Sequence, residues 1–333
     1  MLTLITLLLA VPAEACLWDR DTLAVEQAGM PSVTAVLAGR FDRFPDAWYT
    51  ARLEHALAAI AASPDDLAAH DDAAVALDRL GRQAEAIAMM EAKAEALVRT
   101  GEDSEHRYRL LANQGTFYAH RFLTGSDSPS DLAQAIALIE AAIELNPDAH
   151  FGREVVQLKA LYWLRDASML ASASDLWRQP GLLGFEDWKT QTIQAVLADD
   201  IDQEMVGVVE GLTGLIVLGA AWESPDIHFA LVRALQASGQ SQLAWMARLR
   251  VVELLDAGKT FHQPHNLSHD TLRSTVLDNA FQAIYTPEVV VAEFSAARAE
   301  AEEWHKQRTA WITAQLAAGA HPDTHADFWH GAP

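Results

Sequence analysis

A helical repeat of apolar residues is the feature that most constrains this chain, and it is clearest between residues 108 and 147. In the second half of this stretch, apolar side chains recur at steps of three and four residues, which places them on one face of an α-helix. Pro147 ends the pattern, because proline lacks a backbone N–H and disfavours the α conformation of Asn146. The first half, residues 108–121, predicts a second helix of similar length. The apolar face consists of Leu132, Ala135, Ile136, Ile139, Ala142 and Ile143.

Gly115 lies inside the first of these two helices. A glycine in a helix interior costs about 1 kcal/mol relative to alanine. It is best tolerated where a neighbouring helix must approach closely. We therefore expect the second helix to touch the first at Gly115, with the small Ala135 as its partner.

The rest of the chain varies this pair, and three stretches resemble the tetratricopeptide repeat, whose units of about 34 residues form helix–turn–helix pairs. The opening unit is longer, because residues 123–130 are inserted at its turn. The resemblance implies an all-α fold, an α-solenoid of tetratricopeptide-like helix pairs with extra flanking helices that cover its ends. The matching residues are Gly115, Tyr118, Ala135, Ala142, Ile143 and Pro147 in the opening unit, Ala74, Leu77, Gly81 and Ala86 in residues 67–96, and Gly239 and Ala244 in residues 225–257.

The remaining patterns divide the chain into segments. Prolines and glycines in residues 177–188 predict a break, and residues 204–226 are apolar on all sides, which predicts a buried helix. A long final helix is expected to begin at Thr286 and Pro287 and to end at Gly319. The division is a signal peptide (1–15), an N-terminal capping segment (16–44), a tetratricopeptide-like array (45–176), a second helical part (177–258), and a histidine-containing loop, long helix and polar tail (259–333).

Charge and the first residues bear on partners and location. The chain carries 24 basic and 46 acidic residues, a net charge of −22. A nucleic-acid backbone needs the opposite sign, so a protein or peptide with a basic or neutral surface is the expected partner. Residues 1–15 form an apolar run that ends in Ala-Glu-Ala, which is typical of an export signal and too short to span a bilayer. A buried N-terminal helix is the alternative.

Cleavage of this signal would leave Cys16, the only cysteine, at the start of the mature chain. Acylation of Cys16, as in a bacterial lipoprotein, and soluble export are both open, and a lipid there would be the only membrane contact. The segment that follows, residues 16–23, is expected to fold Trp18 over the first helix; an anchor or a metal contact is the alternative.

Two groups of histidines could bind a metal ion, because imidazole is a common ligand of Zn²⁺, Cu²⁺ and Ni²⁺ and short spacings allow chelation. A polar surface loop and tail is the other interpretation of the same pattern. Single histidines such as His55, His120 and His228 are expected to be packed or solvated. The two groups are His262, His265 and His269, and His321, His325 and His330.

The inner face of the array is the second candidate site. Arg109 and Asn113 are one helical turn apart, a spacing that resembles the carboxylate clamp of some tetratricopeptide proteins. Acidic residues of the preceding unit would repel a carboxylate, so an acidic groove for a basic peptide is the better hypothesis. Ordinary solvated positions are the alternative for Arg109 and Asn113. The candidate groove residues are Asp71, Asp72, Asp78, Arg109, Asn113 and Thr116.

The sequence contains no phosphate-binding glycine loop, no GxSxG motif and no Cys–His pair, and it implies no cofactor. We therefore expect a non-catalytic protein-interaction scaffold of the bacterial cell envelope. An exported metal-binding protein that uses the histidines is the alternative function.

Overall fold

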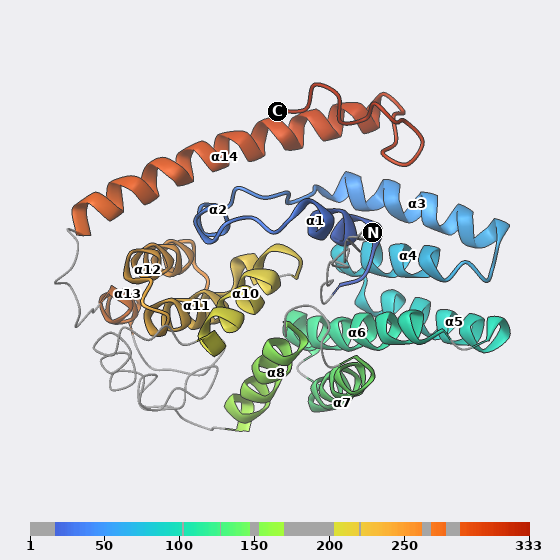
Figure 1. Ribbon diagram of the computed structural model, residues 1–333, viewed down its shortest axis with the longest axis horizontal. Coiled ribbons are helices and arrows are strands. Elements are labelled where there is room, and N and C mark those ends of the chain that lie inside the picture. The colour runs from blue at the N-terminus through green and yellow to red at the C-terminus, as the bar shows by residue number, and fades with distance from the viewer. Residues whose placement is uncertain are drawn as a thin grey trace, which may run out of the picture.

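The computed structural model describes residues 17–101, 103–126, 128–146, 153–169, 203–219, 221–261, 268–277 and 287–333. These residues form helices joined by turns, and no strand occurs among them, so the prediction of an all-α fold is confirmed. Consecutive helices pack against one another along the chain, as the predicted stacking of helix pairs requires (Figure 1).

The helices before residue 170 are α1 (Arg20–Ala28), α2 (Val33–Ala38), α3 (Asp46–Ala62), α4 (Leu67–Arg79), α5 (Gln83–Thr100), α6 (Ser104–Arg121), a π-helical turn (Phe122–Ser126), α7 (Pro129–Leu145) and α8 (Arg153–Met169). Those after residue 202 are α10 (Gln203–Val217), a 3₁₀ turn (Ala221–Glu223), α11 (Pro225–Ala237), α12 (Ser241–Asp256), α13 (His269–Leu277) and α14 (Pro287–Ala317). The predicted break at residues 177–188 lies outside the described part.

The turn glycines that the sequence singled out have the same geometry in both pairs. Gly81 after α4 and Gly239 after α11 have φ values of 74° and 75°, a left-handed conformation that glycine adopts without steric cost. In each turn, the amide after the glycine bonds back to a carbonyl of the preceding helix, Leu77 or Leu235. This is the Schellman pattern that ends a helix and lets the chain reverse into the next one.

Three of the buried apolar clusters join helices that are successive along the chain. One buried cluster joins α3, α4 and α5, with Ala73, Ala74 and Met90 at its centre. A second joins α6, α7 and α8. The third and largest joins α8, α10, α11 and α12 with α2 and α14. As predicted, the apolar side chains of α10 are buried from Val208 to Ile216, and Leu212 and Ile216 have almost no exposed surface.

The N-terminal segment and α14 connect parts of the chain that are distant in sequence. The segment from Leu17 to α2 begins against α6 and ends against α10 and α12, and α14 runs from α12 past α2 to α3 (Figure 1). Trp18, which was expected to fold over the first helix, packs against Tyr108 of α6, with ring centroids 5.4 Å apart. Ala112 belongs to the same buried cluster, and Leu23 of α1, the first helix, packs against it.

Gly115 marks a close approach of α6 and α7, as expected, although Ala135 is not the nearest neighbour. A Cβ atom on Gly115 would lie 2.9 Å from Cδ1 of Ile139 and 3.2 Å from Cβ of Leu138. Both distances are shorter than ordinary van der Waals contacts. The two helices can therefore approach this closely because position 115 has no side chain.

We predict that Gly115→Leu lowers the free energy of unfolding by about 1–3 kcal/mol, because the added side chain overpacks the α6–α7 contact. Gly207→Ala in α10 is the matched control, since no atom lies within 4 Å of the added Cβ. It should raise the free energy of unfolding by up to about 1 kcal/mol through helix propensity. Urea denaturation followed by circular dichroism measures both, and a neutral Gly115→Leu would contradict the close approach.

Candidate functional site

Asn113 of α6 holds the main chain of the N-terminal segment. Its Oδ1 accepts the Trp18 amide N–H at 2.7 Å, and its Nδ2 donates to the Trp18 carbonyl at 3.1 Å. The Asn113 side chain is completely buried. A single amide thus satisfies both main-chain groups of one residue, which is how a protein recognises an extended segment without reading its side chain.

Arg109, one turn before Asn113, contacts the same residue. Its guanidinium lies over the Trp18 indole, 4.6 Å from the ring centroid, a cation–π contact. Arg109 and Asn113 therefore lie on the same face of α6, as predicted, and both contact Trp18. The occupant of this face is a residue of this chain, and the alternative that Asn113 is solvated is wrong.

Asp72 of α4 holds the next part of the segment. Its Oδ1 accepts the Arg20 amide N–H at 3.0 Å, and its Oδ2 accepts the Arg20 Nε at 2.6 Å. Burial raises the pKa of Asp72, and Arg20 opposes this shift. Arg20 also reaches Asp323 of the C-terminal tail at 2.9 Å. The guanidinium of Arg20 thus forms ion pairs with two carboxylates, those of Asp72 and Asp323.

Asp71, the neighbour of Asp72, forms a buried ion pair. Both of its oxygens lie 2.6 Å from Nζ of Lys93 on α5, and its Oδ1 also accepts from Nδ2 of Asn113 at 3.1 Å. Lys93 has no exposed surface, and burial lowers its pKa. The carboxylate of Asp71 therefore connects α4, α5 and α6, and it orients the amide of Asn113 toward Trp18.

The remaining candidates also pair inside the protein. Asp78 accepts from Nδ1 of His120 at 2.8 Å, and the Thr116 hydroxyl accepts from Nε2 of Gln157 at 3.0 Å. Asp71, Asp72 and Asp78 are all less than 7% exposed. The expectation that they line an open acidic groove is wrong in this respect. Asp71 and Asp72 pair with cations of the same chain and Asp78 with an imidazole, since a buried carboxylate without a partner would be too costly there.

Replacement of Lys93 by methionine should destabilise the protein by about 3–5 kcal/mol, because it leaves the carboxylate of Asp71 buried without its cation. The double variant Lys93→Met with Asp71→Leu should recover most of this loss. A double-mutant cycle in urea gives the coupling energy. The matched control is the exposed pair of Arg99 and Asp65, whose disruption should change stability little. Equal losses in the single and the double variant would contradict a buried pair.

Beyond Thr116, the inner face continues into an apolar pocket of about 160 Å³. Helices α6, α8, α10 and α11 and the residues between α10 and α11 form its wall. Asn113 and Thr116 are one turn apart on α6, so the segment-binding face and this pocket lie next to each other. The lining residues include Ala119, Leu123, Ala160, Trp163, Leu215 and Ile227.

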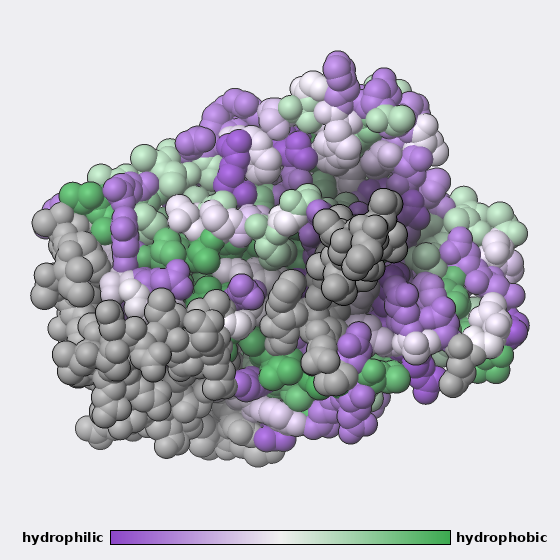
Figure 2. Space-filling model, in the orientation of Figure 1, coloured by the Kyte–Doolittle hydropathy of each residue, from purple (hydrophilic) through white to green (hydrophobic). Residues whose placement is uncertain are grey.

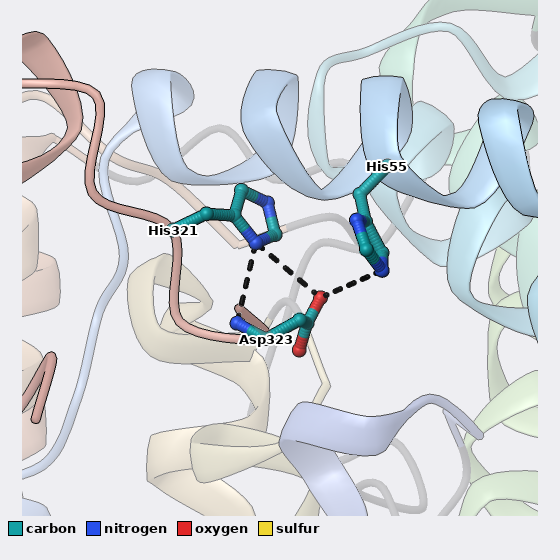
Figure 3. Close-up of side chains that lie close together, drawn as sticks. All are labelled: His55, His321 and Asp323. Atoms are coloured by element: carbon teal, nitrogen blue, oxygen red, sulfur yellow. Dashed lines mark hydrogen bonds and ion pairs between the residues drawn. The ribbon is translucent and has the colours of Figure 1, made fainter. Parts of the chain in front are cut away.

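The structure describes only part of the two predicted histidine groups. His262 and His265 lie outside the described residues, and His269 is exposed beside Asp256. His325 and His330 are exposed as well, whereas His321 turns inward and joins His55 of α3 and Asp323 (Figure 3). From the sequence, His55 was expected to be a single packed or solvated histidine. No local signal could find this group, because α3 and the tail meet only in the tertiary structure.

His228 is packed, as expected for a single helical histidine. It is fully buried, and its Nε2 lies 3.1 Å from the Trp222 carbonyl. Burial lowers its pKa to about 3, with a further contribution from Arg250. His228 is therefore neutral in the folded protein at neutral pH.

Glu154 of α8 is also buried, but burial raises its pKa. It is 2% exposed and accepts from the Tyr108 hydroxyl at 2.6 Å. Burial raises the pKa of Glu154 from 4.5 to about 7, so its folded-state proton stabilises the protein below pH 4.5 and this contribution disappears as the pH rises through 7.

We expect Glu154→Gln to stabilise the protein more at pH 8 than at pH 4.5, by roughly 2–3 kcal/mol between the two conditions. Glutamine keeps the acceptor for Tyr108 and never ionises. Urea denaturation of the wild type and the variant at both pH values gives the difference directly, and the contribution of His228 cancels because both chains contain it. A pH-independent difference would show that the carboxyl is not desolvated.

Comparison with family models, curated proteins and solved structures finds no match to this chain. Cys16 lies outside the described residues. Among the helices that the structure describes, none is long and apolar enough to cross a lipid bilayer.

Proposed function

We propose that this protein is a non-catalytic interaction scaffold whose inner helical face binds extended polypeptide segments. The observation that carries the proposal is the paired hydrogen bonding of Asn113 to the main chain of Trp18. With Asp72 on Arg20, it shows the kind of ligand that these side chains can hold: an extended segment with a basic residue. In this proposal, the N-terminal segment occupies part of the face that a partner uses in the same manner.

The pocket beside Thr116 supplies the second contact. It lies along α6 from the Trp18 contact, and its lining is mainly apolar, which suits an apolar side chain of the partner. On the face shown in Figure 2, hydrophobic side chains form small patches among hydrophilic ones, so a local pocket suits recognition better than a broad apolar surface. The net charge of −22 favours a partner that is basic or neutral.

The tetratricopeptide-like repeat and the location in the cell envelope belong to the same proposal. The repeat is supported by the sequential packing of helix pairs and by the equivalent turns at Gly81 and Gly239. Export is supported by the apolar run in residues 1–15. A lipid on Cys16 would tether the scaffold to a membrane, and soluble export would leave it free.

The test uses the purified full-length chain and two pools of fluorescent peptides of equal length. One pool combines apolar residues with lysine and arginine, and the other replaces the basic residues with aspartate and glutamate. We expect members of the basic pool to bind with Kd values below about 100 µM and the acidic pool to bind more weakly. Higher salt should weaken the interaction, because screening reduces charge attraction.

Ala160→Leu adds a side chain in the pocket and should weaken peptide binding by about tenfold, equivalent to 1.4 kcal/mol. Ala137→Leu, at an exposed position of α7, is the matched control and should bind like the wild type. Fluorescence anisotropy measures all three chains. Failure of both pools to bind, or equal binding by Ala160→Leu, would reject the proposed site.

A further inference from the structure

The tail after α14 brings three potential metal ligands together against α3. His55 comes from the middle of α3, and His321 and Asp323 come from the turn that follows Gly319. One ligand atom from each residue lies within 4.8 Å of the other two (Figure 3). Oδ2 of Asp323 is 3.6 Å from Nε2 of His55 and 3.6 Å from Nδ1 of His321.

His321 is oriented as metal-binding histidines usually are. Its Nε2 lies 3.1 Å from the carbonyl oxygen of Ala51, which is a hydrogen-bond acceptor, so Nε2 carries the proton. Nδ1 then has the lone pair, and it faces Asp323. A second-shell carbonyl that fixes the tautomer in this way is typical of histidine ligands. The lone pair now accepts the Asp323 amide N–H at 3.2 Å, a long contact that a bound ion would replace.

The two carboxylate oxygens of Asp323 have different surroundings. Oδ1 accepts from Arg20 at 2.9 Å and also from Arg52. Oδ2 has almost no exposed surface and no hydrogen-bond partner. A buried acceptor without a partner typically costs about 1–3 kcal/mol. A cation between Oδ2 and the two imidazoles would remove this cost.

The spacing and the donor atoms fit a transition-metal ion. With metal–ligand bonds of about 2.0–2.1 Å in a tetrahedron, neighbouring ligand atoms are roughly 3.4 Å apart, close to the two observed distances of 3.6 Å. Two imidazoles and one carboxylate suit Zn²⁺ better than Mg²⁺ or Ca²⁺, which prefer oxygen ligands. Three protein ligands also leave a fourth position for water.

We propose that His55, His321 and Asp323 form a site for a divalent transition-metal ion, with Zn²⁺ as the best-fitting ion. The ion would link the C-terminal tail to α3 through His321 and His55, which are 266 residues apart in the sequence (321 − 55). Because Arg20 and Arg52 already offset the charge of Asp323, binding should be weaker than in a closed four-ligand site. The site is separate from the pocket on α6, and the inference does not depend on the proposed peptide binding.

Isothermal titration of the metal-free full-length chain with Zn²⁺ tests the site, and Co²⁺ absorption reports the coordination geometry. The wild type should bind one ion. Removal of even an outer-shell partner weakens metal sites by ~10–100-fold, so His55→Ala and His321→Ala should each weaken binding by at least about tenfold. His330→Ala, an exposed histidine of the same tail, is the matched control and should bind normally.

Thermal unfolding with and without Zn²⁺ shows whether each variant is folded and whether the ion stabilises it. The wild type and His330→Ala should be stabilised by the ion, whereas the two site variants should unfold cooperatively with no shift. His55→Gln and His321→Gln replace either alanine variant if it does not fold. Absence of micromolar binding to the wild type, or equal binding by site and control variants, would overturn the proposal.

Discussion

The buried carboxylate of Asp71 is the interaction on which the inner face depends. It neutralises Lys93, which has no exposed surface, and it fixes the amide of Asn113 so that both ends of this amide meet the main chain of Trp18. Removal of Asp71 would leave the cation of Lys93 buried without its partner and would take one acceptor from Nδ2 of Asn113, at the point where three helices meet. The burial of these polar groups is tolerated because each one has a partner.

The same network explains why the N-terminal segment crosses the inner face. Asn113 and Asp72 satisfy the main-chain groups of Trp18 and Arg20, so the segment can be buried there without a partner strand. The guanidinium of Arg20 then links this segment to Asp323 in the tail. The two ends of the described chain are thus linked through one arginine, and α14 extends from α12 to α3 (Figure 1).

The buried carboxyl groups of this acidic chain have different kinds of partner. Asp71 and Asp72 pair with cations of the chain, and Glu154, whose partner is the hydroxyl of Tyr108, has a pKa that burial raises to about 7. Asp323 combines both conditions, since arginines hold one of its oxygens while the other faces two imidazoles. The proposed peptide-binding face and the proposed metal site are therefore distinct consequences of how this fold pairs its charges.

The sequence by itself determined the helices, their turns and the charge. Apolar periodicity predicted the stretches that form α4 to α7, and Gly81 and Gly239 marked the turns, because both signals depend on residues that are neighbours along the chain. The long helix α14 was predictable from Pro287 and Gly319 for the same reason. The close packing at Gly115 was predictable, although its partners were not.

Tertiary structure alone decided which polar groups meet. Asn113 contacts Trp18 across 95 residues, and Asp323 contacts Arg52 across 271. Local patterns carry no information about such pairs, so Asp71, Asp72 and Asp78 were expected to line an acidic groove and His55 was expected to be a single histidine. Their partners are set by the packing of α3, α4 and α6 with the N-terminal segment and the tail. The need to pair every buried charge then determines which of these side chains can serve a ligand.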